Sequence, residues 1–338
     1  MRMWKLGWLC LPLFLGLMVQ DKSHGAEPTV DFAIAIHGGA GIEPETLSDA
    51  QKREHEAALT RAITVGRDIL AKGGTALDAV EQTIRVLEDE PLYNAGRGAV
   101  FNNVGKHELD AAIMDGRDRS TGAVAGVSTI RNPISLARLV MTDTPHVLLI
   151  GDGAEKFADE MQGRAQIERV PNEYFSTEFR RQEWRKAVEQ ERQKQKKVGQ
   201  RESSMSTVGC VVRDRHGNLA AGTSTGGLTN KKWGRVGSVP IAGAGTYADN
   251  RSLAISGTGT GELFIRNSVG FHLHALMIYK GLPLEAAVTE MTDKILEPDS
   301  GGIITVDGRG AIVMRCNTVG MARAKADSRG KTEVLLAR

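Results

Sequence analysis

The sequence predicts an α+β fold in which two packed sheets are covered by helices on both outer faces. Three observations predict it. Helical patterns fill most of residues 47–90, strand patterns dominate from residue 98 to residue 256, and two further helical patterns precede a final hairpin. A chain that orders its elements in this way buries its sheets by stacking them between two layers of helices.

The first half of the chain supplies a strand, two helices and then more strands. Residues 32–36 form an apolar run that enters the glycine loop 37–41, which is typical of a buried strand followed by a tight turn. Helical patterns follow at 47–71 and from a cap at Thr75 to Pro91. The later patterns predict strands at 99–101, 108–114 and 123–130, a helix opened by Pro133, and a buried strand at 147–150.

Residues 173–206 are predicted to form an exposed, mobile linker that is partly helical at most. The first thirty of them hold nine Lys and Arg, six Asp and Glu, and few apolar side chains. A basic arm that binds nucleic acid is the alternative, but the interleaved Glu residues and the lack of spaced aromatic residues argue against it. The patterns beyond the linker predict a hairpin at 207–213 and 219–225, strands at 241–248 and 253–256, helices at 262–279 and 284–296, and a hairpin at 303–306 and 311–315.

The composition is that of an ordinary soluble globular protein. The 338 residues hold 43 Lys and Arg against 41 Asp and Glu, a formal net charge of +2. A charge this close to zero supplies no field for gripping a phosphate backbone, so we expect no nucleic-acid partner. Three cysteines are too few for a disulfide framework or a cysteine-rich zinc site, and the apolar neighbours of Cys210 and Cys316 favour buried free thiols.

Residues 1–26 have the pattern of a secretory signal peptide. Two positive charges within residues 1–5 precede an apolar run at 6–19 that is too short to span a bilayer comfortably. Ala26 is a small residue at the expected cleavage point. We therefore expect a secreted or periplasmic protein that has no membrane contact once the signal is removed; an uncleaved N-terminal anchor is the alternative.

The residues that carry chemistry are threonines and glycines. The polar linker ends abruptly at Thr207, which opens an apolar strand. Two further runs, 222–231 and 256–262, are dense in glycine and in small hydroxyl residues. Such runs bring backbone N–H groups and hydroxyls close together, as an oxyanion site requires.

These motifs resemble the plant-type L-asparaginase and isoaspartyl peptidase family of N-terminal nucleophile hydrolases. The resemblance implies a four-layer αββα sandwich, autoproteolysis between Ser206 and Thr207, and a single domain made of an α chain, 27–206, and a β chain, 207–338. It covers nearly all of residues 30–325, in the stretches IHGGAG (36–41), PLYNAGRGAVF (91–101), HELDAAIMDG (107–116), TVGCVV (207–212), TSTGGLTNK (223–231), GRVG (234–237), GAGTYAD (243–249) and SGTGTGE (256–262).

The chemistry of Thr207 is consistent with that implication. A threonine hydroxyl is a weak nucleophile until a base takes its proton. Cleavage before Thr207 would create an α-amine on the same residue, with an unperturbed pKa of about 7.7–8.0, which can act as that base. Activity is therefore expected to depend on cleavage.

The resemblance also implies roles for single residues. Thr225 corresponds to the threonine that hydrogen-bonds the nucleophile, and Thr258 and Gly259 correspond to the oxyanion-stabilising pair, which also contacts the substrate. Arg235 corresponds to the arginine that binds the substrate α-carboxylate, a task suited to a guanidinium fork. The plain alternatives are strand and turn residues chosen for their size and, for Arg235, a surface ion pair.

Two positions depart from the family pattern. Ser238 stands where the family usually has an aspartate that balances the substrate α-ammonium, and a serine can hydrogen-bond this group but not neutralise it. The lost charge-assisted bond is worth roughly 1.5–3 kcal/mol, so we expect weak binding of substrates with a free α-amine or a preference for a modified amine. Ser206 stands where glycine is common, and slow cleavage is expected because serine has less backbone freedom.

No cofactor is expected for catalysis, whereas a structural Na⁺ is implied by the resemblance of the loop at 87–97. Backbone carbonyls suit a hard cation. A plain loop that ends the helix is the alternative. By resemblance we also expect a dimer of αβ units. The residues implied for sodium are Leu87, Glu88, Glu90, Tyr93, Ala95 and Arg97.

The expected function is that of an autoproteolytically activated threonine hydrolase. Its substrates would be β-aspartyl (isoaspartyl) dipeptides and the side-chain amide of L-asparagine. One alternative is an amidase similar to glycosylasparaginase, against which Ser206 argues because that branch usually has aspartate there. The other is a processing-deficient protein that binds β-aspartyl compounds without cleaving them.

Overall fold

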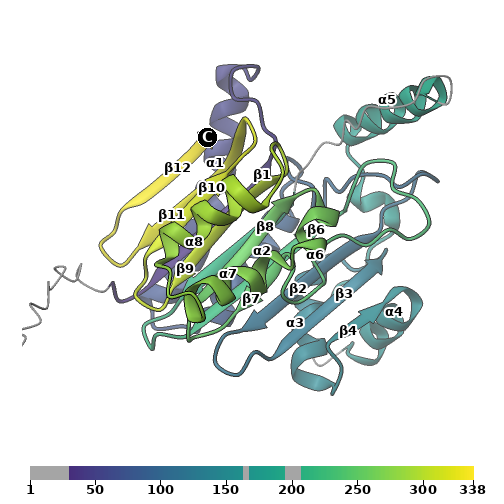
Figure 1. Cartoon of the computed structure of the whole chain (residues 1–338). Coiled ribbons are helices and arrows are strands. Elements are labelled where there is room, and N and C mark those ends of the chain that lie inside the picture. The colour runs from purple at the N-terminus through teal and green to yellow at the C-terminus, as the bar shows by residue number, and fades with distance from the viewer. Residues whose placement is uncertain (1–29, 163–166, 195–206) are drawn as a thin grey trace, which may run out of the picture.

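The computed structural model describes residues 30–162, 167–194 and 207–338. These residues form a mixed α/β structure with one sheet of eight strands and one of four (Figure 1). The expected signal peptide, 1–26, and the residue Ser206 lie outside the described residues.

The large sheet is built around a strand from the start of the chain and a hairpin from its second half. Its strand order is β12–β11–β1–β5–β6–β2–β3–β4, and its neighbours are antiparallel except β3 and β4. The strands are β1 Ala33–Ala40, β2 Leu109–Asp115, β3 Thr121–Val127, β4 Leu148–Ile150, β5 Val208–Arg213, β6 Leu219–Thr225, β11 Gly320–Asp327 and β12 Thr332–Ala337.

The small sheet comes from the second half of the chain, whereas the helices are spread along the whole of it. The small sheet has the antiparallel order β10–β9–β8–β7, with β7 Thr246–Ala248, β8 Leu253–Gly259, β9 Gly301–Asp307 and β10 Ile312–Cys316. The helices are α1 Asp49–Ala71, α2 Ala76–Glu88, α3 Pro133–Asp143, α4 Gly151–Glu160, α5 Glu178–Lys194, α6 Gly261–Arg266, α7 Val269–Ile278 and α8 Leu284–Glu290, with a 3₁₀ turn η1 Asn172–Phe175 and a π-helical turn η2 Met291–Ile295.

Two apolar cores hold these elements together. Helices α1, α2 and α3 pack on the large sheet, and the outward residues of β1, Ile34 and Ile36, lie in the core they share. The alternate residues Ala33 and Ala35 lie in a second core with residues of β8, β9, α7 and α8. Because side chains alternate along a strand, β1 contributes to both cores.

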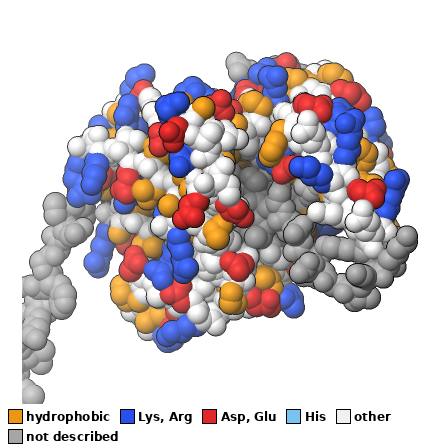
Figure 2. Space-filling model, turned by 90° about the horizontal axis from the view of Figure 1, so that it is seen from above, with side chains coloured by type: hydrophobic (Ala, Val, Ile, Leu, Met, Phe, Trp, Pro, Cys, Tyr) orange, Lys and Arg blue, Asp and Glu red, His pale blue; other side chains and the backbone are white. Residues whose placement is uncertain are grey.

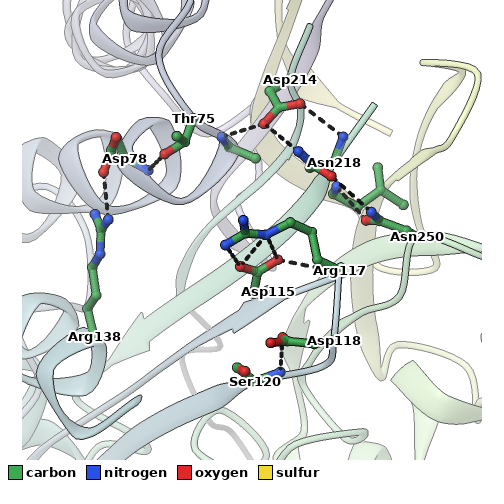
Figure 3. A network of polar contacts seen from close by, with 12 residues as sticks. Thr75, Asp78, Asp115, Arg117, Asp118, Ser120, Arg138, Asp214, Asn218 and Asn250 are labelled. Carbon is green, nitrogen blue, oxygen red and sulfur yellow. Dashed lines mark hydrogen bonds and ion pairs between the residues drawn. The ribbon is translucent and has the colours of Figure 1, made fainter. Parts of the chain in front are cut away.

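The hairpin β5–β6 is tied to the start of α2 and to the small sheet by polar contacts (Figure 3). The carboxylate of Asp214, at the turn, accepts from the backbone N–H of Ala76 at 3.2 Å and from that of Asn218 at 2.9 Å. The Asn250 side chain accepts from the N–H of Leu219 at 2.8 Å. These bonds satisfy a helix N-terminus and hold the hairpin in register with both layers.

Residues 173–194 of the predicted linker form the end of η1 and the helix α5, and the expectation that they are exposed throughout is wrong. Phe175 is fully buried, and Arg180 donates through Nε to the Gly98 carbonyl at 2.8 Å. The Trp184 ring lies 5.6 Å from that of Phe101. The composition predicted a linker because apolar residues are few, but Phe175 and Trp184 pack on the loop before β2. Helix α5 projects from the body of the molecule in Figure 1. Residues 195–206 lie outside the described residues.

Several predicted elements differ in extent. Residues 99–101 form no strand, since the N–H of Val100 donates to the Asn94 side chain. Of the strand predicted at 241–248, only residues 246–248 are in a strand. The strand at 147–150 is exposed at the sheet edge rather than buried. The helix predicted at 262–279 divides at Ser268, whose φ is 45°. Helix α4 and the strands β11 and β12 were not predicted.

The prediction that two cysteines are buried free thiols is confirmed. Cys210 and Cys316 are buried and free. Among these residues, no helix combines the length and apolar character needed to cross a membrane. On the face shown in Figure 2, basic and acidic side chains are interspersed. Many basic and acidic side chains of the described residues form ion pairs, as Arg138 does with Asp78 at 2.6 Å (Figure 3).

Candidate active site

Two threonine hydroxyls meet at the open end of the hairpin β5–β6. Thr207 precedes β5 and Thr225 ends β6, and their Oγ1 atoms are 3.1 Å apart. The register that pairs Val208 with Ser224 places them side by side. Both are buried, and the N–H of Gly227 donates to Thr225 Oγ1 at 3.0 Å. The hydroxyl of Thr225 is thereby held toward Thr207.

His37, at the end of the predicted strand 32–36, contacts the backbone of Thr207. Its Nδ1 donates to the Thr207 carbonyl at 2.9 Å, so Nε2 of the neutral ring accepts from Ser256 Oγ, also at 2.9 Å. Complete burial lowers the pKa of His37 to about 4. The sequence assigns His37 no role in the site, because nothing local to it indicates a contact with a residue 170 positions away.

A small cavity of about 20 Å³, enough for roughly one water molecule, opens beside the two threonines. It brings together Thr207, Thr225, Arg235, Ser238 and Gly259, all predicted from the sequence. Arg235 is the one charged residue among those that line it. The full lining is Thr207, Thr225, Gly227, Leu228, Arg235, Gly237, Ser238, Val239, Gly257, Gly259 and Gly261.

The predicted oxyanion residues lie at the end of β8. Gly259 lines the cavity with a φ of 146°, and a Cβ on it would lie 2.1 Å from the Ser300 carbonyl oxygen, so no other residue fits. Thr258 is buried beside the cavity, and its Oγ1 accepts from the N–H of Ala40 at 3.2 Å. The Thr258 hydroxyl proton therefore remains available to a further acceptor.

Arg235 is oriented by a carboxylate that the sequence did not single out. Its Nε and Nη2 donate to the two oxygens of Glu262, each at 3.0 Å. Its Nη1 lies against Gly237, where a Cβ would be 2.7 Å away. Small residues thus let the guanidinium approach the cavity wall, while Glu262 fixes the plane of its fork. A sequence signal existed only in the spacing of two motifs, GRVG and SGTGTGE.

The loop implied for sodium closes on itself after α2. The carbonyl of Glu88 accepts from the N–H of Arg97 at 2.7 Å, and that of Glu90 from Tyr93 at 3.3 Å. Asn94, which the sequence did not single out, donates from its side chain to the Gly227 carbonyl at 2.8 Å. The loop therefore supports the cavity wall next to Thr225. Among the described residues, no cluster of three or more His, Cys, Asp or Glu could hold a metal ion.

A larger cavity of about 520 Å³ is lined in part by the glycine loop that follows His37. Its lining includes Leu47, Tyr93 and Phe179 and is largely apolar. Of the predicted site residues it contains only Tyr93, so we place the chemistry in the small cavity, where the hydroxyls converge.

Known proteins resemble the chain over nearly its whole described length. The asparaginase family model (Asparaginase_2) matches residues 30–336. Isoaspartyl peptidases of Salmonella typhimurium and Escherichia coli are 47% and 46% identical, each over 86% of this chain and over 94% and 91% of their own lengths. An isoaspartyl peptidase/L-asparaginase of Mus musculus is 41% identical over 86% of this chain and 87% of its own. The chain therefore belongs to the asparaginase family, as its motifs predict.

Proposed function

We propose that the protein hydrolyses β-aspartyl (isoaspartyl) peptides and the side-chain amide of L-asparagine. The observation that carries the proposal is the pair of buried hydroxyls of Thr207 and Thr225 at 3.1 Å, in a cavity whose one charged side chain is Arg235. The relatives that match most of the chain are isoaspartyl peptidases and isoaspartyl peptidase/L-asparaginases, which supports this substrate class.

In this proposal Thr207 is the nucleophile, and the chain activates itself by cleavage before it. The new α-amine takes the proton from Oγ1, which attacks the substrate carbonyl, and the amine then returns the proton to the leaving nitrogen. Water releases the acyl group in a second step. Thr225 holds Oγ1, as the Gly227 contact supports.

The developing oxyanion needs donors that are in place before the reaction. We assign this to the Thr258 hydroxyl and the Gly259 backbone, since the former has its proton to spare and the latter lines the cavity. Arg235 binds the α-carboxylate, and Ser238 faces the α-amine. With no carboxylate among the residues that line the cavity, a free ammonium gains little there, so an uncharged amine is the expected preference.

The same proposal extends to architecture. A large sheet under α1–α3, stacked on a small sheet that carries α7 and α8, supports the αββα sandwich of N-terminal nucleophile hydrolases. Residues 27–206 and 207–338 would then be the α and β chains of one domain. Residues 1–26 would direct export to the periplasm or the medium, and two αβ units would form a dimer.

A structural sodium ion in the loop after α2 is a further part of the proposal. The six carbonyls named above would hold it, and the carbonyls of Leu87, Glu88 and Glu90 already accept backbone hydrogen bonds. A carbonyl oxygen has two lone pairs, so these contacts still allow a cation. Thermal unfolding in sodium and in tetramethylammonium salts at equal ionic strength tests this; equal melting temperatures would refute it.

The main experiment follows the purified protein by denaturing gel, intact mass and amino-terminal sequencing. The expected result is conversion to two chains, the smaller beginning at Thr207, with release of free amino acid from a β-aspartyl dipeptide. Thr207→Ala should abolish both, whereas Thr305→Val, a buried threonine of β9 outside the cavity, should abolish neither. A single persistent band without hydrolysis would favour the non-catalytic binder.

A further inference from the structure

A chain of buried polar groups runs behind Thr207 and crosses between the two sheets. Ser256 Oγ lies 2.9 Å from His37 Nε2 and 2.7 Å from Thr223 Oγ1, and the Thr246 hydroxyl donates to Thr223 Oγ1 at 2.7 Å. None of these four residues exposes any surface. We call His37, Ser256, Thr223 and Thr246 the buried relay.

The protons of the buried relay all point toward Thr207. The Thr207 carbonyl can only accept, so His37 donates through Nδ1 and, being neutral, accepts at Nε2. Ser256 must then donate to His37 and accept from Thr223, which in turn accepts from Thr246. One carbonyl, that of Thr207, therefore sets the direction of every bond in the relay.

The far end of the relay, Thr246, lies next to a residue of the cavity wall. Thr246 Oγ1 lies 3.1 Å from the carbonyl oxygen of Val239, which lines the cavity next to Ser238. Its single proton is donated to Thr223, however, so the hydrogen-bonded chain ends at Thr246. The relay thus connects the main chain of Thr207 to the small sheet through side chains of β1, β6, β7 and β8, and Ser256 lies in the strand β8 that ends in Thr258 and Gly259. Hydrogen bonds in such a low-dielectric chain strengthen one another.

The surrounding chain makes room for the relay at one glycine. A Cβ on Gly209, two residues after Thr207, would lie 2.0 Å from Ser256 Oγ and 2.3 Å from His37 Nε2. Ala35, Val211 and Ala254, from the strands β1, β5 and β8, belong to the apolar core between the sheets. Apolar side chains would hold the sheets together equally well, so packing alone does not account for four linked polar groups beneath Thr207.

We propose that the buried relay positions Thr207 for the reaction by fixing its main chain relative to β8, the strand that ends in Thr258 and Gly259. The inference rests on the proposed role of Thr207 as nucleophile. Its Oγ1 and its α-nitrogen both branch from the residue whose carbonyl His37 holds. A displacement of about 1 Å at a reacting group can cost about a hundredfold in rate. The relay residues are positioning residues, since none of them is among the residues that line the small cavity.

The test separates the hydroxyl of Thr223 from its shape. Thr223→Val keeps the shape and removes the hydroxyl, whereas Thr223→Ser keeps the hydroxyl and removes a methyl group. Thr305→Val is the matched control, because Thr305 is equally buried in β9 but donates to a local carbonyl, that of Val313, at 3.0 Å. The kcat and KM of each variant are measured with a β-aspartyl dipeptide, and kcat is expressed per protein molecule that is both folded and cleaved before residue 207.

For Thr223→Val we expect kcat to fall about tenfold to a hundredfold with KM changed by less than about threefold. Thr223→Ser and Thr305→Val should keep at least about a third of kcat. If Thr223→Val fails to split while Thr223→Ser splits, the proposal is also supported, because splitting uses the same hydroxyl of Thr207. Unchanged kcat in Thr223→Val, or equal losses in the Val and Ser variants, would overturn it.

Thr207→Ala separates a failure of the positioning role from a failure of the proposed function. Hydrolysis that persists in Thr207→Ala refutes the proposed nucleophile itself. Hydrolysis that is lost in Thr207→Ala but runs at the wild-type kcat in Thr223→Val refutes only the positioning role.

Discussion

Acid should destabilise the protein through His37, the buried imidazole that holds Thr207. Burial lowers its pKa from 6.5 to about 4, despite the contact with the Thr207 carbonyl, which favours the charged form. Between these two values the folded protein keeps the ring neutral, whereas the unfolded chain protonates it. The unfolded state then binds more protons, so stability rises with pH in this window and is lost as the pH falls from about 6.5 toward 4.

The size of the effect follows from the two pKa values. They lie about 2.5 pH units apart, and each unit corresponds to about 1.4 kcal/mol, so the full loss at pH 4 is about 3 kcal/mol. Between pH 7 and pH 5 the loss is about 2 kcal/mol. His107 is also buried, with its pKa lowered to about 4, and adds a loss of the same sign.

The assay is urea unfolding of His37→Gln and its parent at pH 7 and pH 5. Both carry Thr207→Ala, so that a single uncut chain unfolds. Glutamine does not titrate, so the stability difference between parent and variant should shrink by about 2 kcal/mol from pH 7 to pH 5. His107→Gln is the matched control, and it should remove only the pH-dependent loss of stability that His107 itself contributes. A parent–variant difference that stays constant to within about 0.5 kcal/mol would refute the reasoning.

Three further predictions concern the cavity and α5. Arg235→Gln should raise KM about tenfold to a hundredfold, because the substrate carboxylate loses a charge-assisted hydrogen bond. The control is Arg266→Gln, which removes an exposed ion pair with Glu297 and should leave KM unchanged. Both are measured by steady-state kinetics, and an unchanged KM for Arg235→Gln would exclude its role in binding the carboxylate. Ser238→Asp should lower the KM for substrates with a free α-amine about tenfold to a hundredfold but leave the KM for their N-acylated forms unchanged. A strong preference of the wild-type protein for the free amine would contradict the role given to Ser238. Arg180→Ala should lower the free energy of unfolding by about 1.5–3 kcal/mol and make α5 susceptible to limited proteolysis, because the bond to the Gly98 carbonyl is lost. Arg185→Ala, which changes an exposed residue of the same helix, should do neither. If Arg180→Ala resists proteolysis as well as the wild type does, the Gly98 contact does not anchor the helix.

Local pattern was enough for the parts of the site that lie close together in the sequence. The strands 207–213 and 219–225 were predicted from alternation and a turn, and their register alone brings Thr207 to Thr225. The family motifs located Arg235, Ser238 and Gly259, which line one cavity. Helix α5 was missed because its few apolar contacts lie on a loop about eighty residues earlier, which composition does not reveal.

The sequence by itself determined the family, the mixed α/β class and the threonine-rich site, because helical and strand periods, caps and motifs are properties of neighbouring residues. Only the tertiary structure decided which partners those residues meet. His37 reaches Ser256 across 219 positions, and Glu262 reaches Arg235 across 27. Such contacts depend on how two sheets stack, and the stacking follows from burial of the whole chain rather than from any segment of it.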